Sequence, residues 1–131
     1  MDRAAINPVT WSLQLGFDQA ELIEGHRRLM VCSGQDAVNA DGEPQHPGDM
    51  AAQLRMAVEN LKATLTAAAM TPANIIRCNV YTTDMAELLK HWSVLTASLG
   101  TSGGGWTTSL LGVSQLAAPQ LLVLLEATAV G

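Results

Sequence analysis

The sequence is poor in charge. Asp, Glu, Lys and Arg make up only 15% of its 131 residues, against 48% hydrophobic residues. This composition excludes a disordered chain, because disorder requires low hydrophobicity and high net charge. The length suits one domain, residues 1–131, with one substantial core. So low a charge fraction also indicates that another subunit covers part of the apolar surface.

Basic clusters are missing as well. The formal net charge is −5, and Arg27-Arg28 is the only basic pair that stands out. A nucleic-acid binder needs cations that displace counterions from phosphates, which this chain lacks. The longest apolar run, Leu121 to Leu125, is far too short to span a bilayer, and the opening MDRAAINPV has no apolar signal region. We therefore expect a cytoplasmic protein that binds neither nucleic acid nor membrane.

Cysteine and histidine are scarce and scattered. Cys32 and Cys78 lie inside apolar, strand-like segments, where buried and reduced core thiols are the usual finding. The three histidines, His26, His46 and His91, have no zinc-like spacing to each other or to the cysteines. We expect no bound metal.

What the sequence does contain is a regular alternation of strand and helix patterns. Apolar residues repeat every three or four positions over 50–69, after the plausible N-cap Asp49, and again over 84–100, after a capping-box pattern at Asp84. The segment Thr101–Gly105 is predicted to be a linker. Segments with strand character cover 18–25 and 29–35, a hairpin-like pair, and then 75–81, 107–114 and 120–130. Two helices must then cover one face of a mixed sheet, and oligomerisation is the simplest cover for the other.

Six ordered stretches together resemble the RidA/YjgF/YER057c/UK114 family. They are Gly16–Ala20, Cys32–Gln35, Asp41-Gly42, Gln53 with Asn60-Leu61, Val80–Asp84 and Leu121–Val130. The resemblance implies an α+β, chorismate-mutase-like fold with a mixed six-stranded sheet and two helices on one face. It also implies a homotrimer with a barrel-like core and small-molecule sites in three intersubunit clefts. The implied activity is the hydrolysis of reactive enamines and imines to ketones, with release of ammonia.

The chain departs from the family pattern at the substrate anchor. The family arginine that opens the penultimate strand and pairs with a substrate carboxylate falls on Thr108, and the proline two residues earlier falls on Trp106. The usual tyrosine near the start falls on Phe17, and a nearby cysteine on Leu110. The hydroxyl of Thr108 cannot replace an arginine guanidinium, which is charged and donates two parallel hydrogen bonds to a carboxylate. We therefore expect a ligand other than a simple 2-imino acid held in the usual way.

Glu126 is the strongest candidate for a catalytic residue. It interrupts an apolar run in the last strand and matches the family carboxylate that positions water. If it were buried, its pKa would rise and suit it to proton transfer near neutral pH. The alternative is a strand face that becomes solvated at its end.

The other candidates would bind substrate, and each has a structural alternative. Ser33, Gly34 and Gln35 end a strand and offer amides and a hydroxyl, or they form a bulge with ordinary capping. Phe17 and Trp106 wall an apolar cleft or pack in a core or interface. Thr108 and Ser109 hydrogen-bond a ligand or are simply strand residues. Arg77 could supply the missing cation, although a salt bridge at the trimer interface is the commoner use.

The sequence thus favours a divergent RidA-type enzyme that adds water to a small enamine, imine or related carbonyl metabolite. Glu126 would position the water, and no cofactor is needed because an iminium carbon is already electrophilic. A non-catalytic trimer that binds small molecules or proteins is the alternative. RNA cleavage, sometimes attributed to the family, is disfavoured by the acidic net charge.

Overall fold

The computed structural model describes residues 1–99 and 105–131. Gly100 and most of the predicted linker Thr101–Gly105 lie outside the described residues. The elements follow one another as β1 (Asp2–Ile6), η1 (Trp11–Leu15), β2 (Ala20–Glu24), β3 (Leu29–Val31), β4 (Gln35–Asp36), α1 (Met50–Ala67), η2 (Pro72–Asn74), β5 (Ile75–Thr82), α2 (Met85–Lys90), α3 (Trp92–Ser98), β6 (Leu110–Gly112) and β7 (Val123–Val130), where η marks a 3₁₀-helix.

The main sheet is built around β7. Its strand order is β3-β7-β5-β6, and β4 also pairs with β7. The β5–β7 pair is antiparallel, whereas β5 and β6 run parallel, so the sheet is mixed as expected. Alternate β7 residues are buried, which fixes one face of the strand toward the core.

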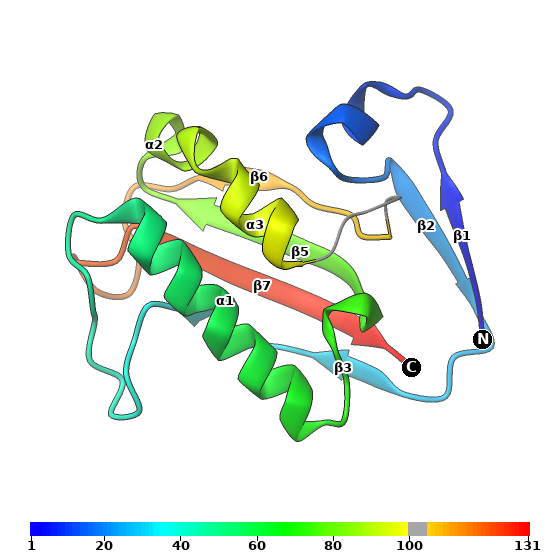
Figure 1. The fold of residues 1–131 in the computed structure, drawn as a ribbon, viewed down its shortest axis with the longest axis horizontal. Helices are drawn as coiled ribbons and strands as arrows, with labels where there is room; N and C mark the ends of the chain where they lie inside the picture. Colours follow the sequence, from blue (N-terminus) through cyan, green and yellow to red (C-terminus); the bar gives the residue numbers. More distant parts are fainter. Residues whose placement is uncertain (100–104) are drawn as a thin grey trace.

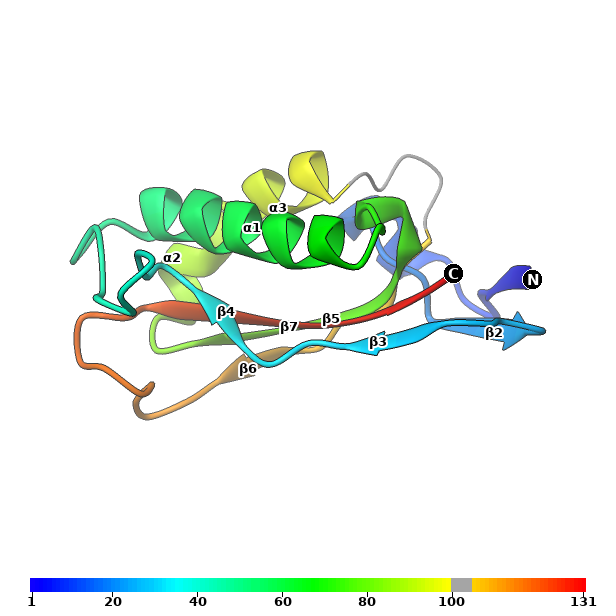
Figure 2. The ribbon, with the colours of Figure 1, turned by 90° about the horizontal axis from the view of Figure 1, so that it is seen from below.

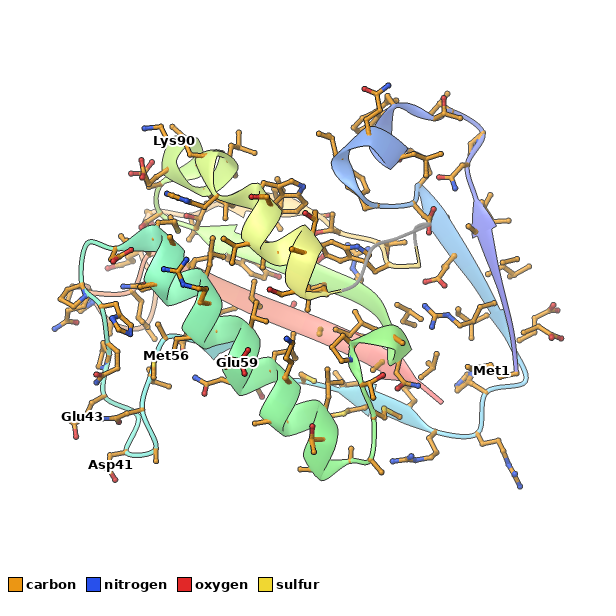
Figure 3. The ribbon with its side chains drawn as sticks, viewed as in Figure 1. Met1, Asp41, Glu43, Met56, Glu59 and Lys90 are labelled. Atoms are coloured by element: carbon orange, nitrogen blue, oxygen red, sulfur yellow. The ribbon has the colours of Figure 1, made fainter. Side chains whose placement is uncertain are left out.

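The α-helices of the described residues, α1, α2 and α3, lie on one side of this sheet, and Figure 2 shows the opposite side bare. The core between the two layers is formed by buried side chains of α1, β5 and β7, among them Leu54, Leu61, Val80 and Leu125, none with any exposed surface. We call the bare side the open face. Its charged residues are few, and Figure 3 shows the labelled Glu59 and Lys90 on the helical layer instead.

The α+β class and the helical cover on one face are confirmed, but the expected single six-stranded sheet is divided. The hairpin predicted around Gly25 does not form, because β2 pairs with β1 while β3 pairs with β7. Gly25 has a φ of +70°, which turns the chain away from β2 after that strand ends. The amides of Arg27 and Arg28 then donate to the carbonyl of Gly131, which directs the following strand onto β7.

The predicted helices are present with small differences. The side chain of Asp49 caps α1 by accepting from the amide of Ala52, and Asp84 caps α2 by accepting from the amide of Glu87. The second predicted helix breaks at His91 into α2 and α3. Leu89, one of the apolar residues of the predicted 84–100 helix, is 54% exposed and does not join the core. None of the described helices has the length and apolarity to cross a membrane.

Residues 1–24 form an N-terminal arm, made of β1, η1 and β2, beyond one end of the main sheet (Figure 1). Arg3 fastens it. Its guanidinium donates to the carbonyls of Ala73 and Gly105, both at 2.6 Å, and to a carboxylate oxygen of Glu21 at 2.8 Å. The arm is thus held against the main body largely by polar contacts.

One buried amide links α1 to the start of β7. Gln53 has no exposed surface, and its Nε2 donates to the carbonyls of His46 and Gln120 at 3.1 and 2.8 Å. Its Oε1 accepts from the amide of Leu122 at 2.8 Å. Three backbone groups therefore depend on a single side chain.

Replacing Gln53 with Met should lower the free energy of unfolding by about 3 kcal/mol, because these backbone groups lose their partner while the side-chain volume is kept. Urea denaturation at fixed protein concentration measures the change. Arg55→Met, on the exposed side of the same helix, is the control and should change stability by less than about 0.5 kcal/mol. Equal effects of the two variants would contradict the bridging role.

Candidate functional site

Glu126 lies on the open face, where it is exposed in the single chain. Strand register places it opposite Asn79 of β5. Its Oε1 accepts a hydrogen bond from the phenol of Tyr81 at 3.0 Å. One chain alone therefore does not bury this carboxylate, and its contact is with a neutral hydroxyl.

The carboxylate of Glu126 changes the pKa of Tyr81. The hydrogen bond to Glu126 raises the pKa of Tyr81 above its usual value of 10.0, with desolvation and the negative charge acting in the same direction. Asn79 and Arg77 oppose the shift. The phenol is therefore held as a donor, and only one oxygen of the Glu126 carboxylate is engaged by it.

Ser33 belongs to the same side of the sheet. Val31 pairs with Thr128, whereas Gln35 pairs with Leu125, so four steps along this segment correspond to three along β7. The segment between them therefore contains a bulge. Continuing the β3–β7 register by two residues places the exposed Ser33 opposite Glu126.

Gly34 and Gln35 have structural contacts of their own. A Cβ on Gly34 would meet the side chain of Leu124 at 2.5 Å, so glycine is required there by close packing. The side-chain amide of Gln35 donates to the carbonyl of Ser33 at 3.2 Å, and its oxygen accepts from Thr64 of α1 at 3.4 Å. Gln35 thus hydrogen-bonds both within the bulge and to helix α1, and Leu124 packs against Gly34.

Ser109 completes a row across the open face. The parallel β5–β6 register, in which Val80 pairs with Leu110, places Ser109 beside Asn79. Its hydroxyl accepts from Nη2 of Arg77 at 3.2 Å. Among the described residues no carboxylate forms an ion pair with Arg77. The side-chain oxygen of Asn79 is buried and has no hydrogen-bond partner in the described chain.

Thr108 and Trp106 point the other way. Positions 106, 108 and 110 are two residues apart and so share one face of the strand, and Leu110 on that face packs against the core. The hydroxyl of Thr108 donates to the carbonyl of Cys78 at 2.6 Å. Trp106 is 2% exposed and stacks on Trp92, with ring centroids 6.1 Å apart. In the single chain Trp106 is therefore a packing residue, and the Thr108 hydroxyl is already engaged.

Phe17 lies in the arm, half-buried, with its ring edge-on to Trp11 at 5.9 Å. Its neighbour Asp18 connects it to Trp106: the Asp18 amide donates to the carbonyl of Trp106 at 3.0 Å, and its carboxylate accepts from the amide of Gly105 at 2.7 Å. The segment that carries Phe17 is thus held beside Trp106. One chain does not bring them to Glu126.

The eight candidate residues therefore fall into two groups. Ser33, Ser109 and Glu126 share the open face, with Gly34 and Gln35 in the adjoining bulge, whereas Phe17, Trp106 and Thr108 lie toward the arm and the core. Sequence reasoning missed Tyr81 as the partner of Glu126. The alternation of Arg77, Asn79 and Tyr81 on one strand face was visible, but only the β5–β7 register shows which of them reaches the carboxylate.

The cysteines are core residues, as predicted. Both are buried and neither forms a disulfide. Burial raises the pKa of the Cys78 thiol to about 12 and also raises that of Cys32. Neither is therefore a thiolate nucleophile at neutral pH. The described residues hold no group of three or more His, Cys, Asp or Glu side chains arranged for a metal ion.

A small α+β domain with helices on one face of a mixed sheet defines a class of fold, and comparison with known proteins identifies the family. The family model described as "Endoribonuclease L-PSP" matches residues 17–131. The chain belongs to this family, whose members among the solved structures are also called Rid or YjgF/YER057c/UK114 proteins.

Three relatives illustrate the similarity. A conserved Rid-family protein of unknown function, YyfB from Yersinia pestis, is 34% identical, with a TM-score of 0.88 and full coverage of both chains. Rv2704 from Mycobacterium tuberculosis, of the YjgF/YER057c/UK114 family, is 27% identical, with a TM-score of 0.67 and coverage of 99% and 100%. A "RutC family protein" from Haemophilus influenzae is 36% identical over 85 residues, which is 64% of this chain but only 55% of that protein.

The Tyr81–Glu126 contact predicts a titration that can be observed directly, because Tyr81 is the only tyrosine in the chain. Tyrosinate formation, followed by ultraviolet difference absorbance, should occur above pH 10.0 and move back toward 10.0 in Glu126→Gln. A raised pKa stabilises the folded chain below pH 10 and loses this contribution as pH rises through the folded-state pKa. Glu59→Gln is the control and should leave the titration unchanged. A wild-type transition at or below 10 would contradict the contact.

Proposed function

We propose that the protein is a Rid-type enzyme that hydrolyses a small enamine, imine or related carbonyl metabolite. The observation that carries the proposal is the position of Glu126: an exposed carboxylate on the open face, fixed by Tyr81, in a chain of the Rid family. The proposed protein is cytoplasmic and works as a homotrimer, with its site in a cleft between copies that cover the open face.

The residues on the open face support a simple mechanism. Tyr81 engages Oε1 of Glu126, which leaves Oε2 for a water molecule. Glu126 takes a proton as the water oxygen attacks the iminium carbon, and passes it to nitrogen, which gives a protonated carbinolamine. As the carbon–nitrogen bond breaks, Glu126 takes the remaining hydroxyl proton and transfers it to the departing ammonia. The products are a ketone and ammonium. Ser33, with the bulge at Gly34 and Gln35, lies where it would hold the polar end of the substrate.

The contacts of Thr108 support a substrate without a carboxylate. Its hydroxyl already donates to the carbonyl of Cys78, and a neutral hydroxyl gives a carboxylate no compensating charge. Of the residues expected to bind substrate, Phe17 and Ser109 would then contact a neutral and partly apolar ligand in the assembled cleft. Trp106 and Thr108 would keep the packing and hydrogen-bond contacts that they have in the single chain. A less charged metabolite fits these residues better than a 2-imino acid.

A non-catalytic binding trimer is the second candidate. It is favoured by one observation: in the single chain Glu126 is exposed, so nothing desolvates it for proton transfer. In this case the same open face would bind a small molecule or a protein without turnover.

Glu126→Gln separates the two functions. If Glu126 is the base, ammonia release from a panel of small neutral enamines and imines generated in situ should fall about 10²-fold, with little change in melting temperature. Glu59→Gln, on the helical layer, should retain wild-type rates. A destabilised Glu126→Gln protein with unchanged turnover would remove Glu126 from the site and favour the binding trimer.

The position of Thr108 predicts a substrate preference. The native protein should show weak or no activity on 2-aminoacrylate-type imines, and Thr108→Arg should raise that activity by restoring a carboxylate partner. Thr66→Arg, which adds the same charge at an exposed position of α1, should not. Robust native activity on these carboxylated imines would show that another cation, such as Arg77, serves as the anchor.

A further inference from the structure

A groove lies between helix α1 and residues 35–40, the segment that contains β4 and the turn after it. Its volume is about 550 Å³, which is within the range of small-molecule sites in proteins. Figure 3 shows the labelled Met56 on the side of α1 that faces the loop carrying Asp41. The residues that line the groove are all uncharged. We call it the amide groove, because two asparagine side chains determine what it can bind.

The first of these side chains, Asn39, offers a fixed hydrogen-bond donor. Its Oδ1 accepts from the backbone amides of Asp41 and Glu43, each at 3.0 Å. Because a backbone N–H needs an acceptor, these two bonds determine which end of the carboxamide is oxygen. The other end, Nδ2, has no partner within residues 1–99 and 105–131. Asn39 lines the groove, so this nitrogen is available there as a donor.

The second side chain, Asn60 of α1, offers a fixed acceptor. Its Nδ2 donates to the carbonyls of Asp36 and Val38 at 2.8 and 3.0 Å, which uses both of its protons and fixes the orientation of the amide. No donor in the described part of the chain reaches its Oδ1. The two asparagines are also neighbours, because the carbonyl of Val38 directly precedes Asn39.

One donor and one acceptor, each on a side chain whose other end is held by two backbone bonds, form a preorganised pair. They match a ligand that carries an acceptor and a donor next to each other, as the C=O and N–H of an amide are. Val38, Met56 and Ala63 add apolar surface to the same groove. A charged ligand would find no opposite charge among the lining residues.

We propose that the amide groove binds a small neutral lactam. Its carbonyl accepts from Nδ2 of Asn39, its N–H donates to Oδ1 of Asn60, and its carbon atoms pack on Met56. A ring holds the amide cis, so C=O and N–H point to the same side, whereas the trans peptide bond of a protein chain points them to opposite sides. This binding needs neither Glu126 nor a second copy of the chain, so it goes beyond the proposed function.

The amide groove also adjoins the bulge on the open face. Gln35 lines the groove, and its Nε2 donates to the carbonyl of Ser33 at 3.2 Å. Its Oε1 accepts from Thr64 of α1, a second lining residue, at 3.4 Å. A lactam in the groove therefore lies against the side chain that holds Ser33, and its binding should also change the environment of the Ser33 amide.

Titration of isotope-labelled protein with δ-valerolactam, followed by two-dimensional amide spectra, tests the site. The side-chain amides of Asn39 and Asn60 should shift saturably, together with the backbone amides of residues 35–40. N-methyl-δ-valerolactam, which lacks the N–H, should bind about tenfold more weakly, the loss expected for one hydrogen bond. Equal affinity for the two compounds, or shifts confined to other residues, would overturn the proposal.

Two variants locate the binding at the amide groove. Asn39→Asp keeps the oxygen that accepts from Asp41 and Glu43 but replaces the free donor with a carboxylate oxygen, so δ-valerolactam should bind about tenfold more weakly. Ala63→Gln places a longer side chain in the groove and should weaken binding at least as much. Ala67→Gln is the matched control: it changes an exposed alanine of α1, one turn further along and outside the groove lining, and should bind like the wild type.

The amide spectra of each variant also report whether it is folded. If Asn39→Asp does not fold, Ala63→Gln decides, because an exposed helical position tolerates glutamine. Wild-type affinity in Ala63→Gln, or an equal loss in Ala63→Gln and Ala67→Gln, would contradict a site in this groove. None of these measurements involves turnover, so the lactam site and the proposed enzyme activity can fail separately.

Discussion

The pairing of β7 with β5 is the interaction on which the rest of the structure depends. The buried residues of the two strands, Val80 and Leu125 among them, form the floor of the core, and the same register sends Tyr81 and Glu126 to the opposite side. A shift of one residue would exchange the two faces of either strand. The packing of the core therefore fixes the position of the Glu126 carboxylate, and no further interaction is needed to orient β7.

The open face combines two features that are seldom useful to an isolated monomer. It is largely apolar at β3 and β6. It also carries Arg77, which forms no ion pair within residues 1–99 and 105–131, and a carboxylate whose described partner is a neutral phenol. A protein that exposed this face permanently would risk aggregation. The proposed assembly would account for both features, because a cover of identical chains would turn an exposed sheet into a set of enclosed clefts. Enclosure would also desolvate Glu126, which a general base in this position needs.

Much of the fold could be predicted because its signals are local. The caps at Asp49 and Asp84, the stripe of α1 and the two-residue alternation of β5 and β7 all depend on neighbours in the sequence, and all are present. The pairing of β2 could not be predicted in this way. Gly25 is typical of a hairpin turn between β2 and β3. The carbonyl of Gly131, far away in the sequence, instead accepts from the amides of Arg27 and Arg28 and so directs β3 onto β7. The break at His91 is likewise not signalled by any proline or glycine.

The candidate site was predictable residue by residue but not as an arrangement. Glu126 stood out because a charge in an apolar strand is unusual, yet its contact with Tyr81 depends on two strands 45 residues apart. The sequence leaves Trp106 as either a cleft wall or a packing residue, and its stacking on Trp92 places it in the core of the single chain. Only the family pattern points to Thr108 as a site residue. The direction of its side chain follows from the alternation of residues along β6, which the sequence alone does not show.

The central claim is that a cleft between copies, lined by the open face, binds a small neutral ligand beside Glu126. A crystal structure of the assembled protein soaked with a small ketone, the product of the proposed reaction, tests it most directly. The account predicts the ketone oxygen within hydrogen-bond distance of Glu126 or Ser33, with a neighbouring copy closing the cleft. A ketone bound only in the amide groove, with the open face exposed to solvent, would contradict it.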